Sequence, residues 1–399
     1  MIDARAARHD PDAFRGRLAR KGAAETFDAW LGADERWREL VPRVDELRAK
    51  TKLKGKPTPE QLEELRGVKE ELQRAEQELA AAEAERDALG LRLPNPPADD
   101  VPDGSTEDDV RVERVVGEPP QLVEPKEHLE LGRFDTERAA RMSGARFGYW
   151  IGDTGRLALA LYRYALDRLA DKGFLTVLPP VLVREEALIG TGAFPSDEQN
   201  VYELPADELY LAGTAEIPVA SLHAGEIFEP EELPLRYVAF SPCFRREAGA
   251  AGRDTRGMIR VHQFNKVEQF ALTLPEASWA EHEQLLANTE ELVRDLGLPY
   301  RVVVLPAGDM SAASAKTYDV EIWFPSQDRY RETASISNTT DFQARRLGIR
   351  YRDGKGTEHV HMLNGTAVVD RMALAILENF QGGVPDVLRA YGAPATVTR

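Results

Sequence analysis

The sequence has almost no cysteine, since Cys243 is the only one in 399 residues. This count excludes an internal disulfide and any zinc site built from several cysteines. Long apolar runs are missing too, because no stretch approaches the roughly 18 to 20 apolar residues that span a bilayer. Residues 1–14 lack the apolar core of a secretory signal. We therefore expect a soluble, cytoplasmic protein.

Basic residues are outnumbered, with 51 Lys and Arg against 68 Asp and Glu, which gives a formal net charge of −17. Such a balance argues against non-specific binding of nucleic acid over the whole surface, although a local basic segment could still contact RNA. Apolar residues make up 42% of the chain, which is ample material for a core. The length suggests two or three domains.

Residues 1–95 show the pattern of a helical hairpin, with a helical lead-in over residues 1–30. Apolar residues recur three and four positions apart in two series, separated by a break at residues 54–59. In that break Pro57 cannot lie inside a helix, whereas Thr58 is typical of an N-cap followed by proline. We expect a first helix of about 19 residues and a second of about 31. The seam positions are Trp37, Leu40, Val44 and Leu47, then Leu62, Leu65, Val68, Leu72, Ala75, Leu79, Ala82 and Leu89, with Arg86 as the one interruption.

A hairpin of this kind often serves as an oligomerisation or spacer element. Here the first helix and the turn are locally basic, in an otherwise acidic chain, which makes an RNA contact a second interpretation. The basic residues are Arg36, Arg38, Arg43, Arg48, Lys50, Lys52, Lys54 and Lys56.

Residues 96–126 are rich in proline and acidic residues and read as a linker with a short strand. In residues 127–399, apolar runs that resemble strands are separated by long excursions without regular helical crossovers. This pattern predicts an α+β domain with a mainly antiparallel sheet flanked by helices. The chain contains no Rossmann fingerprint and no Walker P-loop, so any phosphate must be held in another way.

The densest cluster of chemically active side chains lies in residues 244–268, which read as strand, glycine-rich loop and strand. Arg245 and Glu247 are two apart, and Arg260, Phe264 and Glu268 are four apart, so strand alternation would place each set on one face. Burying such charges is costly without a charged ligand, and arginines suit phosphate oxygens. We interpret the segment as a nucleotide site, whereas an exposed salt-bridged hairpin would be the plainer alternative.

The spacing Arg245-x-Glu247, then Arg260-x3-Phe264-x3-Glu268, resembles motif 2 of class II aminoacyl-tRNA synthetases, and the string FRREAG…GRDTRG…RVHQFNKVE is similar to the seryl-specific version. Residues 173–180 resemble motif 1, the strand at the dimer interface, and residues 365–379 resemble motif 3. The hairpin resembles the arm with which the seryl-tRNA synthetase family grips tRNA-Ser. The resemblance covers essentially the whole chain.

The resemblance implies that the chain activates L-serine with ATP and Mg²⁺ and transfers the seryl group to tRNA-Ser. It also implies that the coiled-coil arm binds this tRNA and that the protein is a homodimer. It implies roles for Arg245 on the α-phosphate and the serine carboxylate, for Glu247 on the adenine amino group, and for Phe264 and Arg371 as the two sides of an adenine sandwich. Glu332 would carry Mg²⁺, with Ser335 nearby. The catalytic set is then Arg245, Glu332 and Arg371; Arg260 joins the ATP-binding set; and the serine-binding set is Thr214, Glu216, Arg245, Glu268 and Thr366.

Several features depart from the family pattern. Asp370 precedes Arg371 where a small or neutral residue is usual, and a carboxylate turned toward that guanidinium would compete with ATP. Alternation along an extended segment points it the other way. Ala334 and Ile336 stand where serine and cysteine are common, and the first arm helix looks short. Three alternatives therefore stay open: a ligase that delivers an aminoacyl adenylate to a carrier protein, an inhibitor-tolerant duplicate synthetase, and a non-catalytic scaffold.

Overall fold

The computed structural model describes residues 1–52, 58–248 and 257–399. They form two compact units, Met1–Pro96 and Pro97–Arg399. Among these residues, every helix is too short or too polar to cross a membrane.

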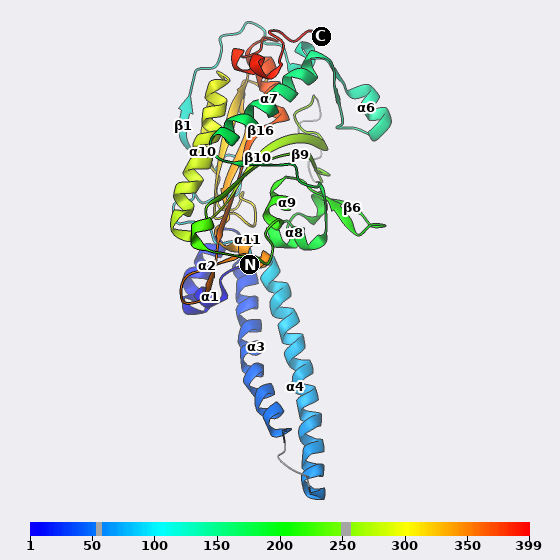
Figure 1. The fold of residues 1–399 in the computed structure, drawn as a ribbon, viewed down its shortest axis with the longest axis vertical. Coiled ribbons are helices and arrows are strands. Elements are labelled where there is room, and N and C mark those ends of the chain that lie inside the picture. Colours follow the sequence, from blue (N-terminus) through cyan, green and yellow to red (C-terminus); the bar gives the residue numbers. More distant parts are fainter. Residues whose placement is uncertain (53–57, 249–256) are drawn as a thin grey trace. The chain divides into compact units, whose positions relative to one another are not determined.

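In the N-terminal unit, two long helices run antiparallel side by side, α3 (Ala24–Lys50) and α4 (Pro59–Arg92) (Figure 1). They follow two short helices, α1 (Ala4–His9) and α2 (Pro11–Ala19). Val44, Leu47 and Ala75 are buried along the seam, which confirms the predicted coiled-coil hairpin. Arg86 interrupts the seam because its guanidinium carbon lies 4.1 Å from the centroid of the Trp37 ring, where it makes a cation–π contact in place of an apolar one.

The length predicted for the first arm helix is wrong. The helix α3 spans 27 residues and α4 spans 34. The helix begins at Ala24, well before Trp37, the first residue of the predicted seam, because Phe27 and Trp30 extend its apolar face and pack against Leu18 and Leu93. The predicted start of α4 is confirmed, since the Thr58 hydroxyl accepts the Gln61 N–H at 3.3 Å and the Gln61 side chain accepts the Thr58 N–H at 2.9 Å.

The C-terminal unit is built on an eight-stranded sheet of order β1-β11-β12-β13-β16-β10-β9-β4. All neighbouring strands are antiparallel except β4 and β9, which confirms the predicted fold class. In this order the strands are β1 (Arg111–Val116), β11 (Tyr300–Val304), β12 (Lys316–Phe324), β13 (Arg329–Asn338), β16 (His361–Val369), β10 (Gln263–Thr273), β9 (Leu235–Phe244) and β4 (Leu175–Val177).

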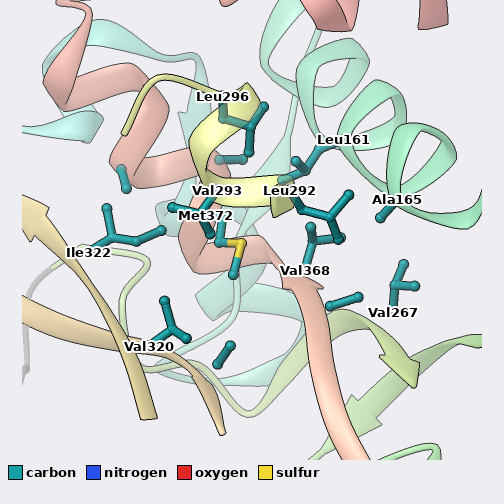
Figure 2. Packing of buried hydrophobic residues seen from close by; sticks show 14 of the residues in the cluster. Leu161, Ala165, Val267, Leu292, Val293, Leu296, Val320, Ile322, Val368 and Met372 are labelled. Atoms are coloured by element: carbon teal, nitrogen blue, oxygen red, sulfur yellow. The ribbon is translucent and has the colours of Figure 1, made fainter. Parts of the chain in front are cut away.

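Three helices pack on this sheet and form the main core with it: α7 (Asp153–Asp171), α10 (Ser278–Asp295) and α12 (Asp370–Asn379). Figure 2 shows Leu161 of α7, Leu292 of α10 and Met372 of α12 gathered around Val267 and Val368 of the sheet. This layer is apolar, so the charged side chains of motifs 2 and 3 are left to the other side of the strands.

Shorter elements complete the unit. The remaining helices are α5 (His128–Leu131), α6 (Thr136–Ser143), α8 (Glu185–Thr191), α9 (Glu216–Ser221) and α11 (Phe342–Leu347). The remaining strands are β2 (Phe134–Asp135), β3 (Tyr149–Trp150), β5 (Leu182–Val183), β6 (Tyr202–Leu204), β7 (Leu209–Leu211), β8 (Ile227–Phe228), β14 (Arg350–Arg352) and β15 (Thr357–His359).

Candidate active site

A cavity of about 490 Å³ collects the side chains that the sequence singled out. They come from segments far apart in the chain, brought together by strands β10, β13 and β16 and by the start of α12. The eleven predicted site residues all line this cavity: Thr214, Glu216, Arg245, Glu247, Arg260, Phe264, Glu268, Glu332, Ser335, Thr366 and Arg371.

The predicted strand geometry of motif 2 is wrong for three of these residues. Strand β9 ends at Phe244 and β10 begins only at Gln263, so Arg245, Glu247 and Arg260 lie outside the strands. Glu247 has a φ of 53°, a left-handed conformation that no strand contains. The side chains still converge, because Arg260 forms an ion pair with Glu247.

Arg245 lies against Phe264. Its Nε donates to the Gly213 carbonyl at 3.3 Å, and its guanidinium carbon lies 5.2 Å from the centroid of the Phe264 ring. These contacts hold a permanent positive charge beside an aromatic face in the cavity, which suits a ligand that has both an anionic group and a planar ring.

Thr214, Lys266 and Glu268 form a hydrogen-bonded cluster in the cavity wall. Lys266 Nζ donates to Thr214 Oγ1 at 2.7 Å and pairs with the Glu268 carboxylate. The Thr214 hydroxyl lies 3.4 Å from Glu268 Oε2. Lys266 and Glu268 are buried, and Glu268 lies opposite Thr366 in the neighbouring strand. The cluster places hydroxyl and carboxylate oxygens together in a site that is largely shielded from water.

Glu216 adds a second carboxylate to this wall. Gln343 and Asn364 donate to its Oε1 at 2.7 and 3.0 Å, and its backbone N–H donates to the Thr214 hydroxyl at 3.2 Å. Burial, followed by the charge of Glu268, raises the pKa of Glu216. Because Lys266 already pairs with Glu268, a further cationic group, such as an ammonium, would be stabilised beside Glu216.

Asp319 and Glu332 form another acidic pair, on the adjacent strands β12 and β13. The Ser335 hydroxyl donates to the Asp319 carboxylate. Burial, followed by the charge of Glu332, raises the pKa of Asp319 well above its ordinary value. A bound cation would relieve this repulsion. Mg²⁺ is held in nucleotide sites by one or two carboxylates together with phosphate oxygens, so this pair fits it.

Arg371 reaches across the cavity from the first turn of α12. Its Nη2 donates to the Ile259 carbonyl at 3.2 Å, its Nη1 donates to the Glu332 carbonyl, and the same nitrogen lies 3.8 Å from the Glu332 carboxylate. The neighbouring Asp370 does not turn toward this guanidinium: its carboxylate accepts from the Asn265 N–H at 3.0 Å and from the Tyr162 hydroxyl.

Comparison with known proteins agrees with this geometry. A model of the seryl-tRNA synthetase N-terminal domain matches residues 1–97, and one of the class II tRNA synthetase core domain (G, H, P, S and T) matches residues 201–380. A serine–tRNA ligase of Thermobifida fusca is 45% identical over 411 residues, covering 98% of this chain and 97% of that protein. The chain belongs to the seryl-tRNA synthetase family.

Solved structures of the family share the whole fold. The seryl-tRNA synthetase of Pyrococcus horikoshii, complexed with ATP, matches with a TM-score of 0.93 at 38% identity over the full length of both chains. The cytoplasmic serine–tRNA ligase of Naegleria fowleri, in complex with AMP, matches with a TM-score of 0.88 at 32% identity, covering 98% of this chain and 96% of that one.

Some residues of this seryl-tRNA synthetase family site were missed by the sequence reasoning. Lys266 stands two positions from both Phe264 and Glu268, so strand alternation alone could have found it. Asp319 closes a stretch of small residues that carried no visible chemistry, and Gln343 and Asn364 read as ordinary polar residues. Their place in the cavity depends on strand and helix packing that has no local signal in the sequence.

Proposed function

We propose that this chain activates L-serine with ATP to form seryl-adenylate and transfers the seryl group to the 3′-hydroxyl of the terminal adenosine of tRNA-Ser. The observation that carries the proposal is the meeting, in one cavity, of a shielded hydroxyl–carboxylate cluster with a set of arginines and a separate acidic pair. The cluster suits serine, and the arginines and the acidic pair suit ATP.

In the first step, a serine carboxylate oxygen bonds to the α-phosphorus of ATP while the bond from that phosphorus to the bridging oxygen breaks and pyrophosphate leaves. Two anions must approach each other, so the chain has to neutralise charge rather than move protons. Arg245 would contact both the serine carboxylate and the α-phosphate. Positioning and charge neutralisation therefore account for catalysis without a histidine or cysteine.

The adenine would lie between the Phe264 ring and the Arg371 guanidinium. Glu247 would accept a hydrogen bond from the adenine amino group, and its ion pair with Arg260 orients the carboxylate. Arg371 is held at its guanidinium by two backbone carbonyls, so its plane is fixed before the nucleotide arrives.

Mg²⁺ would be held by Glu332, with Asp319 and the Ser335 hydroxyl beside it. The ion, when bound, supplies positive charge to the phosphate oxygens of ATP. Ser335 keeps the Asp319 carboxylate oriented through its hydrogen bond.

Serine would lie against Thr214, Glu216, Glu268 and Thr366. The two carboxylates suit its ammonium and hydroxyl groups, while Arg245 takes its carboxylate. Threonine adds a methyl group and is rejected by shape.

The test is ATP–pyrophosphate exchange with purified protein, which should require both serine and Mg²⁺. Exchange that is independent of serine would contradict the serine assignment.

We further propose that the arm formed by α3 and α4 contacts the tRNA. Much of its basic charge is already paired, since Arg36 bonds to Glu85, Arg43 to Glu71 and Glu78, and Arg48 to Glu76. In helix α3 and the two residues that follow it, all within the described part of the chain, three exposed basic side chains have no acidic partner and remain available for phosphates: Arg38, Lys50 and Lys52.

Charge reversal of these three arm residues to glutamate should raise the KM for tRNA-Ser by about 10- to 100-fold near physiological salt, because phosphate contacts are lost. Serine-dependent exchange should stay unchanged, since it needs no tRNA. A matched control reverses Arg352, Lys355 and Arg389 of the catalytic unit and carries the same change in net charge. Equal losses in both triple variants would show a bulk charge effect instead.

We also propose a homodimer, through the segment that resembles motif 1. Strand β4 is the last strand at its edge of the sheet, and the apolar side chains of Leu175, Leu178 and Leu182 near it are 58%, 77% and 42% exposed. Apolar side chains grouped at an open sheet edge favour a covering partner, and a second copy of the chain fits the family resemblance.

Replacing Leu175 and Leu178 together by glutamate should convert the protein from a dimer to a 44.4 kDa monomer in analytical ultracentrifugation. Charges at this edge would have to be desolvated in the interface. Val112→Glu, in strand β1 at the opposite edge of the same sheet, is the control and should leave the mass unchanged. A double leucine variant that keeps the wild-type mass would refute this interface.

A further inference from the structure

One buried carboxylate in the lining of the cavity takes no part in the chemistry described above. Asp370 is 5% exposed, and its carboxylate accepts the Tyr162 hydroxyl on one oxygen and the Asn265 N–H, at 3.0 Å, on the other. Tyr162 comes from α7, Asn265 from β10 and Asp370 from the first turn of α12. These three residues, here called the Asp370 cluster, tie together three elements.

The cluster stands where the sheet stops and the helix starts. Strands β10 and β16 pair as far as Lys266 and Val369, and at Asp370 the chain turns into α12. The next N–H along β10, that of Asn265, has no β16 carbonyl to bond, and the Asp370 carboxylate accepts it instead. The side chain thus extends the β10–β16 pairing by one hydrogen bond after β16 has left the sheet.

The sequence neighbours of the cluster are the two sides of the proposed adenine sandwich. Phe264 precedes Asn265, and Arg371 follows Asp370. The hydrogen bond between Asn265 and Asp370 therefore joins the backbone that carries the ring to the backbone that carries the guanidinium.

We propose that Asp370 is a positioning residue that sets the spacing between Phe264 and Arg371 and so tunes affinity for the adenine of ATP. The proposal rests on the function proposed above, because it takes these two side chains as the adenine site. Asp370 acts through the backbone of its neighbours and does not touch the nucleotide.

The cluster is poorly explained as a device for stability. Burial raises the pKa of Asp370 from 3.8 to about 6. The folded chain therefore binds this proton more tightly than the unfolded chain, so stability falls as pH rises from about 4 to about 6, and the ionised carboxylate costs stability at every higher pH. An asparagine could make similar hydrogen bonds without that cost. The hydrogen bonds of the cluster therefore matter here for where they hold Phe264 and Arg371, and not for the stability of the fold.

The test compares four variants by exchange kinetics and by calorimetric binding of a non-hydrolysable ATP analogue. Asp370→Ala removes both hydrogen bonds, Tyr162→Phe removes one, and Asp370→Asn keeps the shape and an acceptor. Tyr164→Phe is the matched control, because Tyr164 lies on the same helix and its hydroxyl donates to Asp295, at 2.9 Å, outside the cavity.

Asp370→Ala should raise the KM and Kd for the nucleotide by roughly 10-fold, as a shift in positioning does, with a smaller increase in Tyr162→Phe. Asp370→Asn should recover most of the affinity and melt no lower than wild type near neutral pH, as the sign of the pKa shift requires. The KM for serine should change by less than about twofold in every variant, as should all constants of Tyr164→Phe.

Three results would overturn the proposal. The first is wild-type nucleotide affinity in both Asp370→Ala and Tyr162→Phe; if Asp370→Ala does not fold, Tyr162→Phe alone decides. The second is an equal rise in the KM for ATP and for serine, which would mean a general loss of structure. The third is a wild-type protein that does not bind the analogue at all, which would remove the proposed function together with the inference. If the wild-type protein binds the analogue but the variants do not show the expected loss of affinity, only the inference about Asp370 is overturned.

Discussion

Replacing Arg245 by alanine is expected to lower the kcat/KM of serine-dependent ATP–pyrophosphate exchange by about a thousandfold or more. The reaction brings the serine carboxylate and the α-phosphate together, and we propose that Arg245 contacts both. Removing one preorganised donor that stabilises charge in the transition state costs about 3 to 4 kcal/mol. The Phe264 ring would also lose the guanidinium that lies beside it.

The control is Arg236→Ala, on strand β9, which ends one residue before Arg245. Arg236 pairs with Glu281 at 2.6 Å and does not line the cavity. That variant should lose some stability, because a partly buried ion pair is broken, but its exchange rate should stay within about threefold of wild type. Near-normal exchange in Arg245→Ala, or equal losses in both variants, would contradict the assignment of Arg245.

Alanine is expected to support exchange with a kcat/KM about ten thousandfold below that of serine. Thr214 and Glu268 form a hydrogen-bonded cluster in the shielded wall of the cavity. A ligand without a hydroxyl would leave polar groups of that wall unpaired, and sites built around a substrate hydroxyl reject analogues that lack it by about 10⁴-fold. The discrimination thus comes from the cost of unmade hydrogen bonds in the pocket.

The measurement is exchange with serine, alanine and glycine at matched concentrations, repeated in Glu268→Gln and Thr214→Val. In both variants the kcat/KM for serine should fall by about 100-fold while that for alanine changes little. The ratio of the serine kcat/KM to the alanine kcat/KM should therefore decrease. If the wild-type kcat/KM for alanine lies within a hundredfold of that for serine, Thr214 and Glu268 do not recognise the serine hydroxyl.

Elements with strong local patterns could be predicted from the sequence. The arm hairpin follows from the spacing of its apolar residues, and the N-cap at Thr58 follows from residue type alone. The start of α3 was predicted less accurately. Phe27 and Trp30 pack against the distant Leu93, and local periodicity does not reveal this contact. The helix α10 and the strand β13 were not recognised, since their polar residues acquire partners only in the folded sheet.

In the site, too, some features follow from local sequence patterns and others depend on long-range packing. Resemblance in the motifs singled out residues that the fold gathers in one cavity, but strand alternation gave the wrong reason for Arg245, Glu247 and Arg260, which lie outside the strands. The pairing of Asp319 with Glu332 depends on the alignment of β12 with β13, whose register shifts between Val320 and Glu321. A long-range register of this kind leaves no trace in the spacing of residues along one strand.

The most direct measurement of the central claim is charging of tRNA-Ser transcripts by the purified protein with ATP, Mg²⁺ and serine. We expect seryl-tRNA to form, and we expect charging to fall sharply when the variable arm of the transcript is removed. Serine-dependent exchange without any charging would contradict it, and would indicate a ligase that delivers seryl-adenylate to a different acceptor.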